Sequence, residues 1–467
     1  MAKKKITLEE KLEEAIVKDT YYEVPENWVW TYMSNIGVYI NGKAFKPIDW
    51  DTKGLPIIRI QNLTGTNNEF NYFSGEIEEK YKVFNNDLLM AWSATLDAFL
   101  WNGNDAVLNQ HIFKVKSLIN KKYHYYLLKN IIQEMYSKTH GTGMVHITKG
   151  KFEKLKVPLP PLKEQERIVD KIESLFKKLD KAKELIEEAR DDFEKRRSAI
   201  LVKAFRGELT KEWRKNNLVE NNIFELLIRQ NNKIKKNFKF TQATELFNLP
   251  NEWYWMKLKD ICEKFKYGTS SKSKEEGKIP VLRMGNLQGG KLDWSNLVYT
   301  SDEEEISKYD LKFGDLLFNR TNSPELVGKT SIYQCERQAI YAGYLIRVRT
   351  FKDINSKYIN YFMNSIFAKH RCMEVKNDGV SQSNINAEKL GGFDIPVPSL
   401  EEQNEIVRIL DKLLDEESKI EELTALEEQI ELIKKSILAK AFRGQLGTNC
   451  EEDESALELL KKILSEK

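Results

Sequence analysis

Cysteine and histidine are scarce in this sequence, which has four cysteines and five histidines among 467 residues. The cysteines lie far apart and form no Cys-x-x-Cys pair, which excludes a disulfide framework or a zinc site as the main organiser of the fold. Long apolar runs are also missing, because no stretch approaches the roughly 18 residues of a membrane span. The first residues, MAKKK, lead into a charged segment and do not resemble a signal peptide. We therefore expect a cytoplasmic protein without membrane contact.

A marked excess of charge of one sign is absent as well. The sequence has 74 basic and 71 acidic side chains, so its formal net charge is +3. Totals of this kind average over any charged patch, and the net charge alone neither identifies nor excludes a nucleic-acid-binding protein.

What the sequence does contain is an internal repeat. The segment PENWVW at residues 25–30 returns as PNEWYW at 250–255, VPLPPLKEQ at 157–165 returns as IPVPSLEEQ at 395–403, and KAFRG at 203–207 returns at 440–444. The period is too long for a solenoid, so each repeat is predicted to be a globular domain followed by a helix. Short apolar runs separated by Gly, Asn and Pro predict mixed strands and loops in each domain, with helices over 123–136 and 356–375.

A long helix is predicted to close each repeat. Residues 161–206 have apolar side chains at alternating spacings of four and three from Ile168 to Phe193, which is a heptad pattern, and the helix would be roughly 70 Å long. The second copy, residues 399–443, is weaker in its middle, around Glu417 and Glu427. We expect the two helices to pair as an antiparallel coil, and the alternative is that each helix packs on its own domain. Thr7 and Glu10 predict a capping box for a helix over 8–17, and similar helices are predicted over 220–233 and 454–466.

These motifs carry a resemblance to a known family. Two blocks that open with Pro-x-x-Trp-x-Trp, end in Pro-x-Pro-x-Leu-x-Glu-Gln and continue into a helix closing in Lys-Ala-Phe-Arg-Gly resemble the specificity subunit of type I restriction-modification systems. The resemblance implies an α+β fold with two pseudo-repeated mixed α/β target-recognition domains, separated by two long antiparallel coiled-coil helices. The implied divisions are an N-terminal helix (1–20), target-recognition domain 1 (21–160), spacer helix 1 (161–206), a linker with a short helix (207–249), target-recognition domain 2 (250–398), spacer helix 2 (399–443) and a tail helix (444–467).

The resemblance also implies partners and a division of labour. Each domain would read one half of a split, asymmetric sequence in double-stranded DNA, and the helices would act as a ruler and as a docking surface for two modification methyltransferase subunits. Those subunits would carry S-adenosylmethionine and methylate adenine, and restriction subunits would add ATP-driven translocation and cleavage. The residues of the recurring boxes assigned to partner binding are Glu164, Gln165, Glu402, Gln403, Phe205 and Phe442.

Catalytic motifs are missing from the chain itself. An adenine methyltransferase needs a glycine-rich turn for its cofactor and an Asn/Asp-Pro-Pro-aromatic loop for the flipped base, and the sequence has neither. Gly328-Lys329-Thr330 resembles the end of a P-loop, but Ser323 replaces the leading glycine. We predict no catalytic residue, no metal site and no cofactor in this chain.

Three loops in matching places of each block supply candidate DNA-binding side chains, because cations suit phosphates, while amide, hydroxyl and guanidinium groups suit base edges. In the first block the candidates are Lys43, Lys46, Trp92, Ser93, Thr95, Thr142 and Lys149. In the second they are Thr269, Ser270, Lys272, Lys274, Arg320, Asn322, Ser323, Lys329, Ser381, Gln382 and Ser383. Arg320 and Asn322 are the predicted base contacts, and the lysines are predicted to hold phosphates.

Two alternatives stay open from the sequence. The modest net charge and the acidic second helix also fit a two-domain coiled-coil scaffold that binds proteins and no DNA. The same module could also serve as the specificity subunit of a type IIB-like system, where the difference would lie in neighbouring polypeptides.

Overall fold

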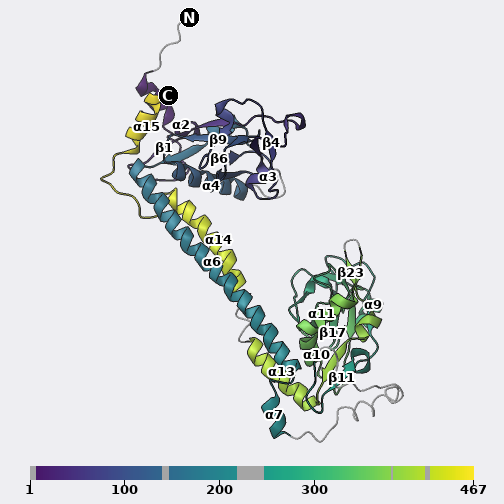
Figure 1. Ribbon diagram of the computed structural model, residues 1–467. Coiled ribbons are helices and arrows are strands. Elements are labelled where there is room, and N and C mark those ends of the chain that lie inside the picture. Colours follow the sequence, from purple (N-terminus) through teal and green to yellow (C-terminus); the bar gives the residue numbers. More distant parts are fainter. Residues whose placement is uncertain (1–6, 139–146, 218–246, 380–381, 416–420) are drawn as a thin grey trace. The chain divides into compact units, whose positions relative to one another are not determined.

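The structure is a computed structural model that describes residues 7–138, 147–217, 247–379, 382–415 and 421–467 (Figure 1). The chain divides into two compact units. Unit 1 consists of Met1–Ile186 and Thr424–Lys467, and unit 2 consists of Glu187–Leu423. In the part of the chain that the structure describes, no helix combines the length and the apolar character that crossing a membrane requires.

Unit 1 contains two four-stranded sheets. The first has the order β2 (Gly37–Asn41), β9 (Ile112–Ser117), β6 (Leu88–Ala91) and β7 (Asp97–Leu100). The second has the order β4 (Asn71–Phe73), β3 (Leu55–Ile58), β8 (Ala106–Leu108) and β5 (Lys82–Val83), in which only the β3–β8 pair is parallel. A separate ladder pairs β1 (Val29–Tyr32) with β10 (Lys156–Leu159), and α4 (Lys121–Lys138) lies beside β7.

Unit 2 repeats this plan. Its first sheet has the order β12 (Lys266–Tyr267), β21 (Leu345–Val348), β17 (Leu316–Asn319) and β19 (Thr330–Ile332), and its second has the order β16 (Val298–Thr300), β13 (Ile279–Leu282) and β20 (Ile340–Tyr341). The β13–β20 pair is again parallel, and β11 (Tyr254–Lys257) pairs with β24 (Asp394–Val397) as β1 does with β10. Short ladders join β14 (Leu287–Gln288) to β15 (Lys291–Leu292), and β18 (Thr321–Asn322) and β22 (Asn377–Asp378) to β23 (Ser383–Asn384). The predicted repeat of a mixed α/β domain is therefore confirmed.

The shorter helices complete each unit. Unit 1 has α1 (Leu8–Ala15), α2 (Met33–Ile36), α3 (Ile60–Leu63), α5 (Lys149–Glu153), α15 (Ala456–Glu466) and the 3-10 helices η1 (Pro47–Asp49) and η2 (Glu79–Tyr81). Unit 2 has α7 (Lys211–Asn216), α9 (Glu303–Tyr309), α10 (Ser356–Met363), α11 (Ile366–Val375), α12 (Ala387–Gly391), η4 (Leu258–Asp260) and η5 (Met284–Asn286). The capping box of Thr7 and Glu10 is present, and α1 packs on α15. The helix predicted over 220–233 lies outside the described residues.

One predicted helix is divided in two. The sequence predicts a single helix over residues 356–375, whereas α10 ends at Met363 and α11 begins at Ile366. Asn364 Nδ2 donates to Asn360 O at 2.8 Å, and Ser365 Oγ donates to Phe362 O at 2.6 Å. Side chains that bond to nearby backbone carbonyls compete with the helical ladder, which explains the break.

The first of the two predicted long helices is present, and the second is described in two parts. Helix α6 (Leu162–Phe205) runs without interruption through 44 residues and contributes to both units. The second predicted helix, 399–443, is described as α13 (Leu400–Asp415) in unit 2 and α14 (Glu421–Ala441), nearly all of which belongs to unit 1, and residues 416–420 between them lie outside the description.

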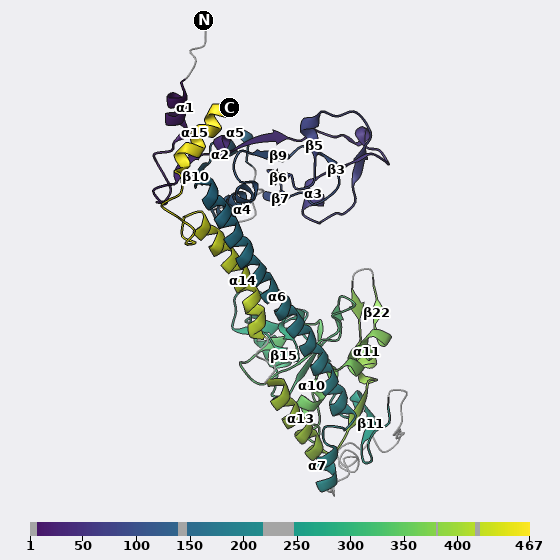
Figure 2. The ribbon, with the colours of Figure 1, turned by 60° about the vertical axis from the view of Figure 1, so that its left-hand side comes forward.

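In unit 1, α14 lies along the first half of α6 in antiparallel fashion (Figures 1 and 2). Arg167, near the start of α6, donates from Nε to Thr448 O at 2.9 Å, whereas Asp180, further along α6, binds Lys434 Nζ at 2.6 Å. The partner residue number falls as the α6 residue number rises, so the predicted antiparallel pairing is confirmed here. The alternative that each helix packs only on its own domain is wrong for α14.

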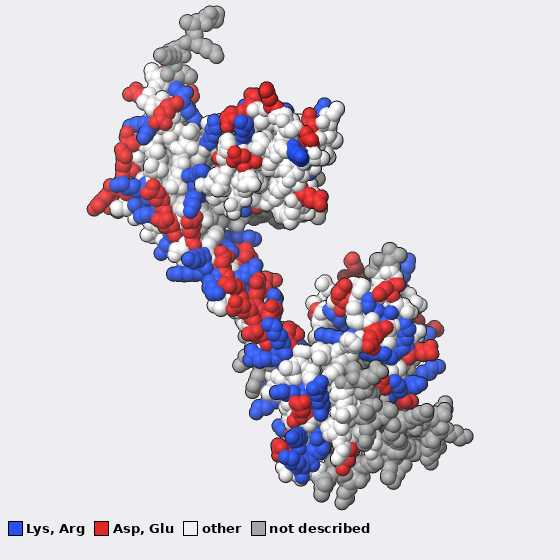
Figure 3. All heavy atoms as spheres, viewed as in Figure 1, with Lys and Arg blue, Asp and Glu red and all other residues white. Residues whose placement is uncertain are grey.

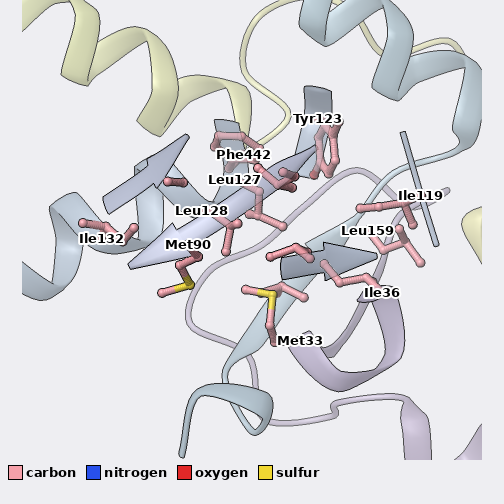
Figure 4. Close-up of a cluster of buried hydrophobic side chains, with 14 of the residues drawn as sticks. Met33, Ile36, Met90, Ile119, Tyr123, Leu127, Leu128, Ile132, Leu159 and Phe442 are labelled. Atoms are coloured by element: carbon pink, nitrogen blue, oxygen red, sulfur yellow. The ribbon is translucent and has the colours of Figure 1, made fainter. Parts of the chain in front are cut away.

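The core of unit 1 contains side chains from both repeats. Figure 4 shows Phe442, from the end of the second repeat, beside Tyr123 and Leu127 of α4. Phe442 is fully buried, and its ring centroid lies 5.3 Å from that of Tyr123. The core of unit 2 is built reciprocally, because Phe205 from the first repeat packs 5.4 Å from Tyr358 of α10. Each unit is therefore a domain of one repeat closed by the helix end of the other.

Candidate nucleic-acid interface

The recurring boxes meet at one junction in each unit. In unit 1, Glu164 at the start of α6 accepts hydrogen bonds from Trp28 Nε1 at 2.7 Å, Asn449 Nδ2 at 2.9 Å and Thr448 Oγ1 at 3.3 Å. Trp28 belongs to the opening box of the first repeat, and the other two donors follow KAFRG of the second repeat. One buried carboxylate thus ties three separate segments together.

Unit 2 contains the same junction with a cation added. Glu402 accepts from Trp253 Nε1 at 2.9 Å and from Thr210 Oγ1 at 2.6 Å. Arg214 also donates to Glu402 from Nη2 at 2.7 Å and from Nε at 3.0 Å. Hydrogen bonds to a charged group are stronger than neutral ones, so this buried carboxylate is strongly held.

The glutamine after each glutamate anchors the first long helix of the domain. Gln165 donates to Pro160 O and accepts from Asn120 N, both at 2.9 Å, and Asn120 caps the start of α4 through Tyr123 N. Gln403 repeats both bonds in unit 2, with the carbonyl of Pro398 and the amide of Asn355, the N-cap of α10.

The KAFRG ends fit closely against the opening boxes. Gly444 has φ +70°, and a Cβ there would lie 2.4 Å from Pro25 Cδ. Gly207 has φ +71°, and its Cβ would lie 2.5 Å from Pro250 Cγ. Only glycine combines this left-handed conformation with so close an approach.

These contacts correct the assignment of the box residues to direct partner binding. Glu164, Gln165, Glu402, Gln403, Phe205 and Phe442 are all buried within the chain. Their polar groups are satisfied by the junctions, and the two phenylalanines fill cores. The recurrent boxes therefore close each unit, and their side chains are not available on its surface for another subunit.

The candidate reading residues lie elsewhere, at one end of the first sheet of each unit. In unit 2, Arg320 follows the last residue of β17, its amide donates to Tyr344 O at 3.0 Å, and its carbonyl accepts from Ile385 N at 2.9 Å. Its guanidinium carbon lies 4.9 Å from the centroid of the Tyr267 ring. Tyr267 is 39% exposed, so the arginine lies against an accessible aromatic ring, and Tyr344, whose backbone carbonyl it bonds, is 56% exposed.

In unit 1 the equivalent position is Trp92. It follows β6, and its amide donates to His111 O at 3.1 Å, as Arg320 does to Tyr344. Its indole Nε1 donates to Asn41 Oδ1 at 3.0 Å, and the Trp92 and His111 rings meet edge to face at 5.0 Å.

Strand register shows that these positions correspond. Leu88 pairs with Val115 in unit 1, and Leu316 pairs with Val348 in unit 2. Counting along the strands from these pairs shows that Trp92 is equivalent to Arg320 and that His111 is equivalent to Tyr344. The β2–β9 and β12–β21 ladders show in the same way that Asn41 is equivalent to Tyr267. The same scaffold thus presents an indole, an imidazole and an amide in unit 1, and a guanidinium and two phenols in unit 2.

Close backbone approach fixes the strand ends that carry these groups. A Cβ on Gly42 would lie 2.0 Å from Asn109 O, and a Cβ on Gly268 would lie 2.3 Å from Tyr341 O. Each glycine follows the β2 or β12 strand, at the same position in both units.

Several predicted residues gather at the same ends. Asn322 pairs with Ser383 across β18 and β23, and Lys329 lies in the segment between β17 and β19, where its Nζ donates to Gln288 Oε1 at 3.1 Å. In unit 1, the backbone of Lys43 forms an isolated parallel β-bridge with that of Asn109.

The other predicted residues differ in exposure. Lys46, Thr95, Lys149, Ser270, Lys272, Lys274 and Gln382 are exposed, and Lys43, Trp92, Ser93, Arg320, Asn322, Ser323 and Lys329 are half-buried. Lys149 is engaged, since its Nζ donates to Tyr39 O at 2.7 Å. Thr142 and Ser381 lie outside the described residues.

Two predicted DNA contacts require correction. Thr269 is buried, and its hydroxyl donates to Glu305. Ser383 is fully buried, and its hydroxyl donates to Asp378. Both hydroxyls serve the fold of the loops and do not face outward.

Four residues at the sheet ends were not among the predicted site residues: Asn41, His111, Tyr267 and Tyr344. Asn41 ends β2 and Tyr267 ends β12, whereas His111 and Tyr344 lie in turns that carry no repeated motif. Only the strand pairing brings them beside Trp92 and Arg320.

Surface charge is mixed on the visible face of the described residues. Figure 3 shows basic and acidic side chains interspersed over both units on this face. Within the described residues, no three His, Cys, Asp or Glu side chains gather as a metal ion would require.

Comparison with known proteins identifies the family. The sequence matches the family described as "Type I restriction modification DNA specificity domain" at residues 25–190 and 250–432. It is 25% identical to the type I restriction enzyme EcoBI specificity subunit of Escherichia coli, covering 95% of this chain and 93% of that protein. It is 27% identical to the EcoKI specificity subunit of Escherichia coli strain K12, covering 95% and 96%.

Relatives also occur in an archaeon, and a solved structure shares the fold. The type I restriction enzyme MjaVIII specificity subunit of Methanocaldococcus jannaschii is 27% identical, covering 91% of this chain and 94% of that protein. A chain solved for "Structural basis underlying complex assembly and conformational transition of the type I R-M system" has a TM-score of 0.63 at 18% identity, covering 91% of this chain and all of that one. Because the family match covers well over half of the sequence, once in each repeat, this chain belongs to the type I restriction-modification DNA specificity family.

Proposed function

We propose that this chain is the DNA sequence-recognition subunit of a type I restriction-modification complex. The observation that carries the proposal is the pair of matched sheet ends: one scaffold, present twice, offers two unlike sets of side chains at the same positions. A protein that reads two different DNA tracts needs this combination, because fold and reading chemistry are then independent.

Each unit would read one half of a bipartite, asymmetric site. Direct readout requires side chains that reach base edges, and Arg320 in unit 2 and Asn41 in unit 1 have the appropriate donor and acceptor groups. Exposed lysines near the same loops, Lys46, Lys272 and Lys274, would supply phosphate contacts that fix the register without reading sequence.

The chain would contribute no reaction of its own. In the proposed complex two modification methyltransferase subunits bind this chain, carry S-adenosylmethionine and methylate adenine, and restriction subunits add ATP-dependent translocation and cleavage. Because the box residues are buried, the methyltransferase subunits would have to dock on other surfaces, and the exposed faces of α6 and α14 are the candidates.

The test is methylation by the assembled complex. The chain is co-expressed with its methyltransferase partner, and the methylated positions of the host genome are sequenced. A split motif with a fixed spacer supports the proposal, and unmethylated DNA despite an assembled, S-adenosylmethionine-binding complex contradicts it. Binding to duplex DNA should also weaken with salt, with a logarithmic slope that counts the phosphate contacts.

Helix α6 supplies a second test, because it contributes to both units. Inserting one helical turn between Glu184 and Arg197 should change the preferred spacer and leave both half-sites intact. An unchanged spacer would refute a ruler function for this helix.

A further inference from the structure

We infer that Arg320 reads a guanine in the half-site of unit 2, and that Tyr267 is the residue that positions it. The matching place in unit 1, where Trp92 bonds to Asn41, has an indole instead of the guanidinium and reads a different base. This inference rests on the proposed function, because it names the chemistry by which the same DNA-reading site discriminates.

The backbone around Arg320 is fixed on both sides. Its amide donates to Tyr344 O and its carbonyl accepts from Ile385 N, at 3.0 and 2.9 Å. These bonds tie the end of β17 to the turn before β21 and to the segment after β23. These backbone bonds therefore fix the direction in which the Arg320 side chain leaves the main chain.

The guanidinium is also held in place. It lies 4.9 Å from the centroid of the Tyr267 ring, which supports the planar group by a cation–π contact. The ring is fixed in turn, because Tyr267 OH accepts a hydrogen bond from Ala387 N at 3.0 Å and Tyr267 lies in the β12 strand. An arginine held flat in this way loses less side-chain entropy when it binds.

The charge of Arg320 has no hydrogen-bond or ion-pair partner among the described residues. Among the described residues no carboxylate or carbonyl accepts a hydrogen bond from its guanidinium, and its Nε is buried without an acceptor. By contrast, Arg349, at the opposite end of the same sheet, pairs with Asp315 through two bonds of 2.6 Å. A structural arginine is thus satisfied here, whereas Arg320 has its outer nitrogens available for a ligand.

The ligand that fits is a guanine edge. A planar guanidinium matches guanine O6 and N7 with two parallel hydrogen bonds, and this is the commonest specific contact between a side chain and a base. A phosphate could also accept from arginine, but it would not need the flat support of Tyr267. The support of this ring favours a base edge over a backbone oxygen.

Unit 1 provides an internal comparison. At the matched place the Trp92 indole donates to Asn41 Oδ1 at 3.0 Å, which orients the amide and leaves its Nδ2 with no acceptor among the described residues. An asparagine amide pairs with adenine N6 and N7 and not with the two acceptors of guanine. The two half-sites should therefore differ at the base read from this position.

The experiment uses the full chain in complex with its methyltransferase partner. The wild-type target is first determined from the methylated genome, and binding is then measured on duplexes that carry each of the four bases at each position of both half-sites. Arg320→Ala and Arg320→Lys are compared with wild type, with Asn41→Ala as the matched variant of unit 1.

We expect Arg320→Ala to reduce the preference for guanine at a single position of one half-site by roughly 5- to 150-fold. Arg320→Lys should keep the slope of the salt dependence and lose most of the preference, because a lysine cannot form the planar fork. Asn41→Ala should change one position in the other half-site. Unchanged binding to the half-site that is not altered, and unchanged assembly with the partner, show that each variant is folded.

Tyr267 is tested by rescue. Tyr267→Leu removes the supporting ring and should weaken discrimination at the same position as Arg320→Ala, whereas Tyr267→Phe keeps the ring and should retain most of it. A fold role alone would lower binding to every sequence for both variants.

The outcomes separate the two proposals. If Arg320→Ala lowers affinity equally for all sequences and reduces the salt slope by about one, Arg320 holds a phosphate and the inference is wrong. If the discriminated base is not guanine, the inference is also wrong, although the proposed function stands. If the wild-type complex shows no sequence preference, the proposed function itself fails, and the inference fails with it.

Discussion

The junction around Glu402 makes a sharp prediction about stability. The variant Glu402→Ala removes the acceptor for three side chains at once, the Trp253 indole, the Thr210 hydroxyl and the Arg214 guanidinium. Glu402 is 3% exposed, and the Arg214 side chain is 19% exposed, so the cation would be left in a largely buried place without a counter-charge and with the Gly207 carbonyl as its remaining backbone acceptor. Breaking a buried ion pair by removing one member costs about 3 to 5 kcal/mol.

The unit 1 junction is the matched comparison. Among the described residues Glu164 accepts from neutral donors, Trp28, Thr448 and Asn449, so Glu164→Ala strands no charge there. We expect it to cost about 1.5 to 3 kcal/mol, which is less than Glu402→Ala. Glu402→Gln should lie between them, because it keeps an acceptor oxygen of the same size but loses the charge.

The assay is hydrogen exchange measured by mass spectrometry on the full chain. Peptides that cover the end of α6 and α7 should exchange about 10²- to 5 × 10³-fold faster in Glu402→Ala, because the loss of stability lowers the opening free energy of that segment. Peptides that cover α1 and α15 should not change. Equal effects of Glu402→Ala and Glu164→Ala, or faster exchange spread evenly over both units, would refute the role given to Arg214.

Three further outcomes follow from the structure. Gly444→Ala should lower the thermal stability of unit 1 by more than Gly447→Ala does. Both glycines have positive φ, but of the two only Gly444 would bring its new Cβ against Pro25. Equal losses of stability would show that the backbone conformation alone matters. Burial lowers the pKa of His124 to about 3 from its usual 6.5, so the free energy of unfolding falls as the pH drops below 6.5 toward 3, where the unfolded chain binds a proton that the folded chain does not. Between pH 7 and pH 5, His124→Gln should lose about 2 kcal/mol less of this free energy than wild type does. Parallel stability profiles of the two proteins against pH would contradict this. Asn286→Ala should destabilise the second sheet of unit 2 by about 2 to 4 kcal/mol in urea unfolding, because its buried amide accepts from one backbone group and donates to two, and a loss below 1 kcal/mol would be against it.

Much of the architecture could be predicted because the sequence contains an internal repeat. The heptad pattern predicted a helix over 161–206, and α6 runs from Leu162 to Phe205. Proline, glycine and the Glu-Gln pair mark the same boundaries in both copies, so one copy supports the reading of the other. Trp28 and Trp253 hold the same place in the two opening boxes, and both are buried.

The roles of the boxes could not be predicted, because each box works with a segment far away in the sequence. Glu402 looks like an exposed helix-start glutamate in the sequence, yet its partners Thr210 and Trp253 come from 192 and 149 residues earlier. Motifs that recur in both repeats were interpreted as partner contacts, whereas they recur because both units close in the same way. The positions that differ between the repeats are the ones that we propose to read DNA.

The sequence predicted some of the candidate DNA-reading residues but not others, and strand pattern again explains the difference. Trp92 and Arg320 follow strands whose pattern is recognisable in both copies, so their equivalence was predictable from the loops. His111 and Tyr344 stand in turns whose sequences share nothing, and only strand register shows that they correspond.

The exchange of helix ends has a consequence for synthesis on the ribosome. Unit 2 is continuous in sequence and can close once α13 has emerged, but unit 1 waits for α14 and α15, which are made after the whole of unit 2. The domain translated first is thus completed last. At ordinary elongation speeds of about 5 to 20 residues per second, its apolar surface stays open for many seconds, a window in which a nascent chain depends on chaperones.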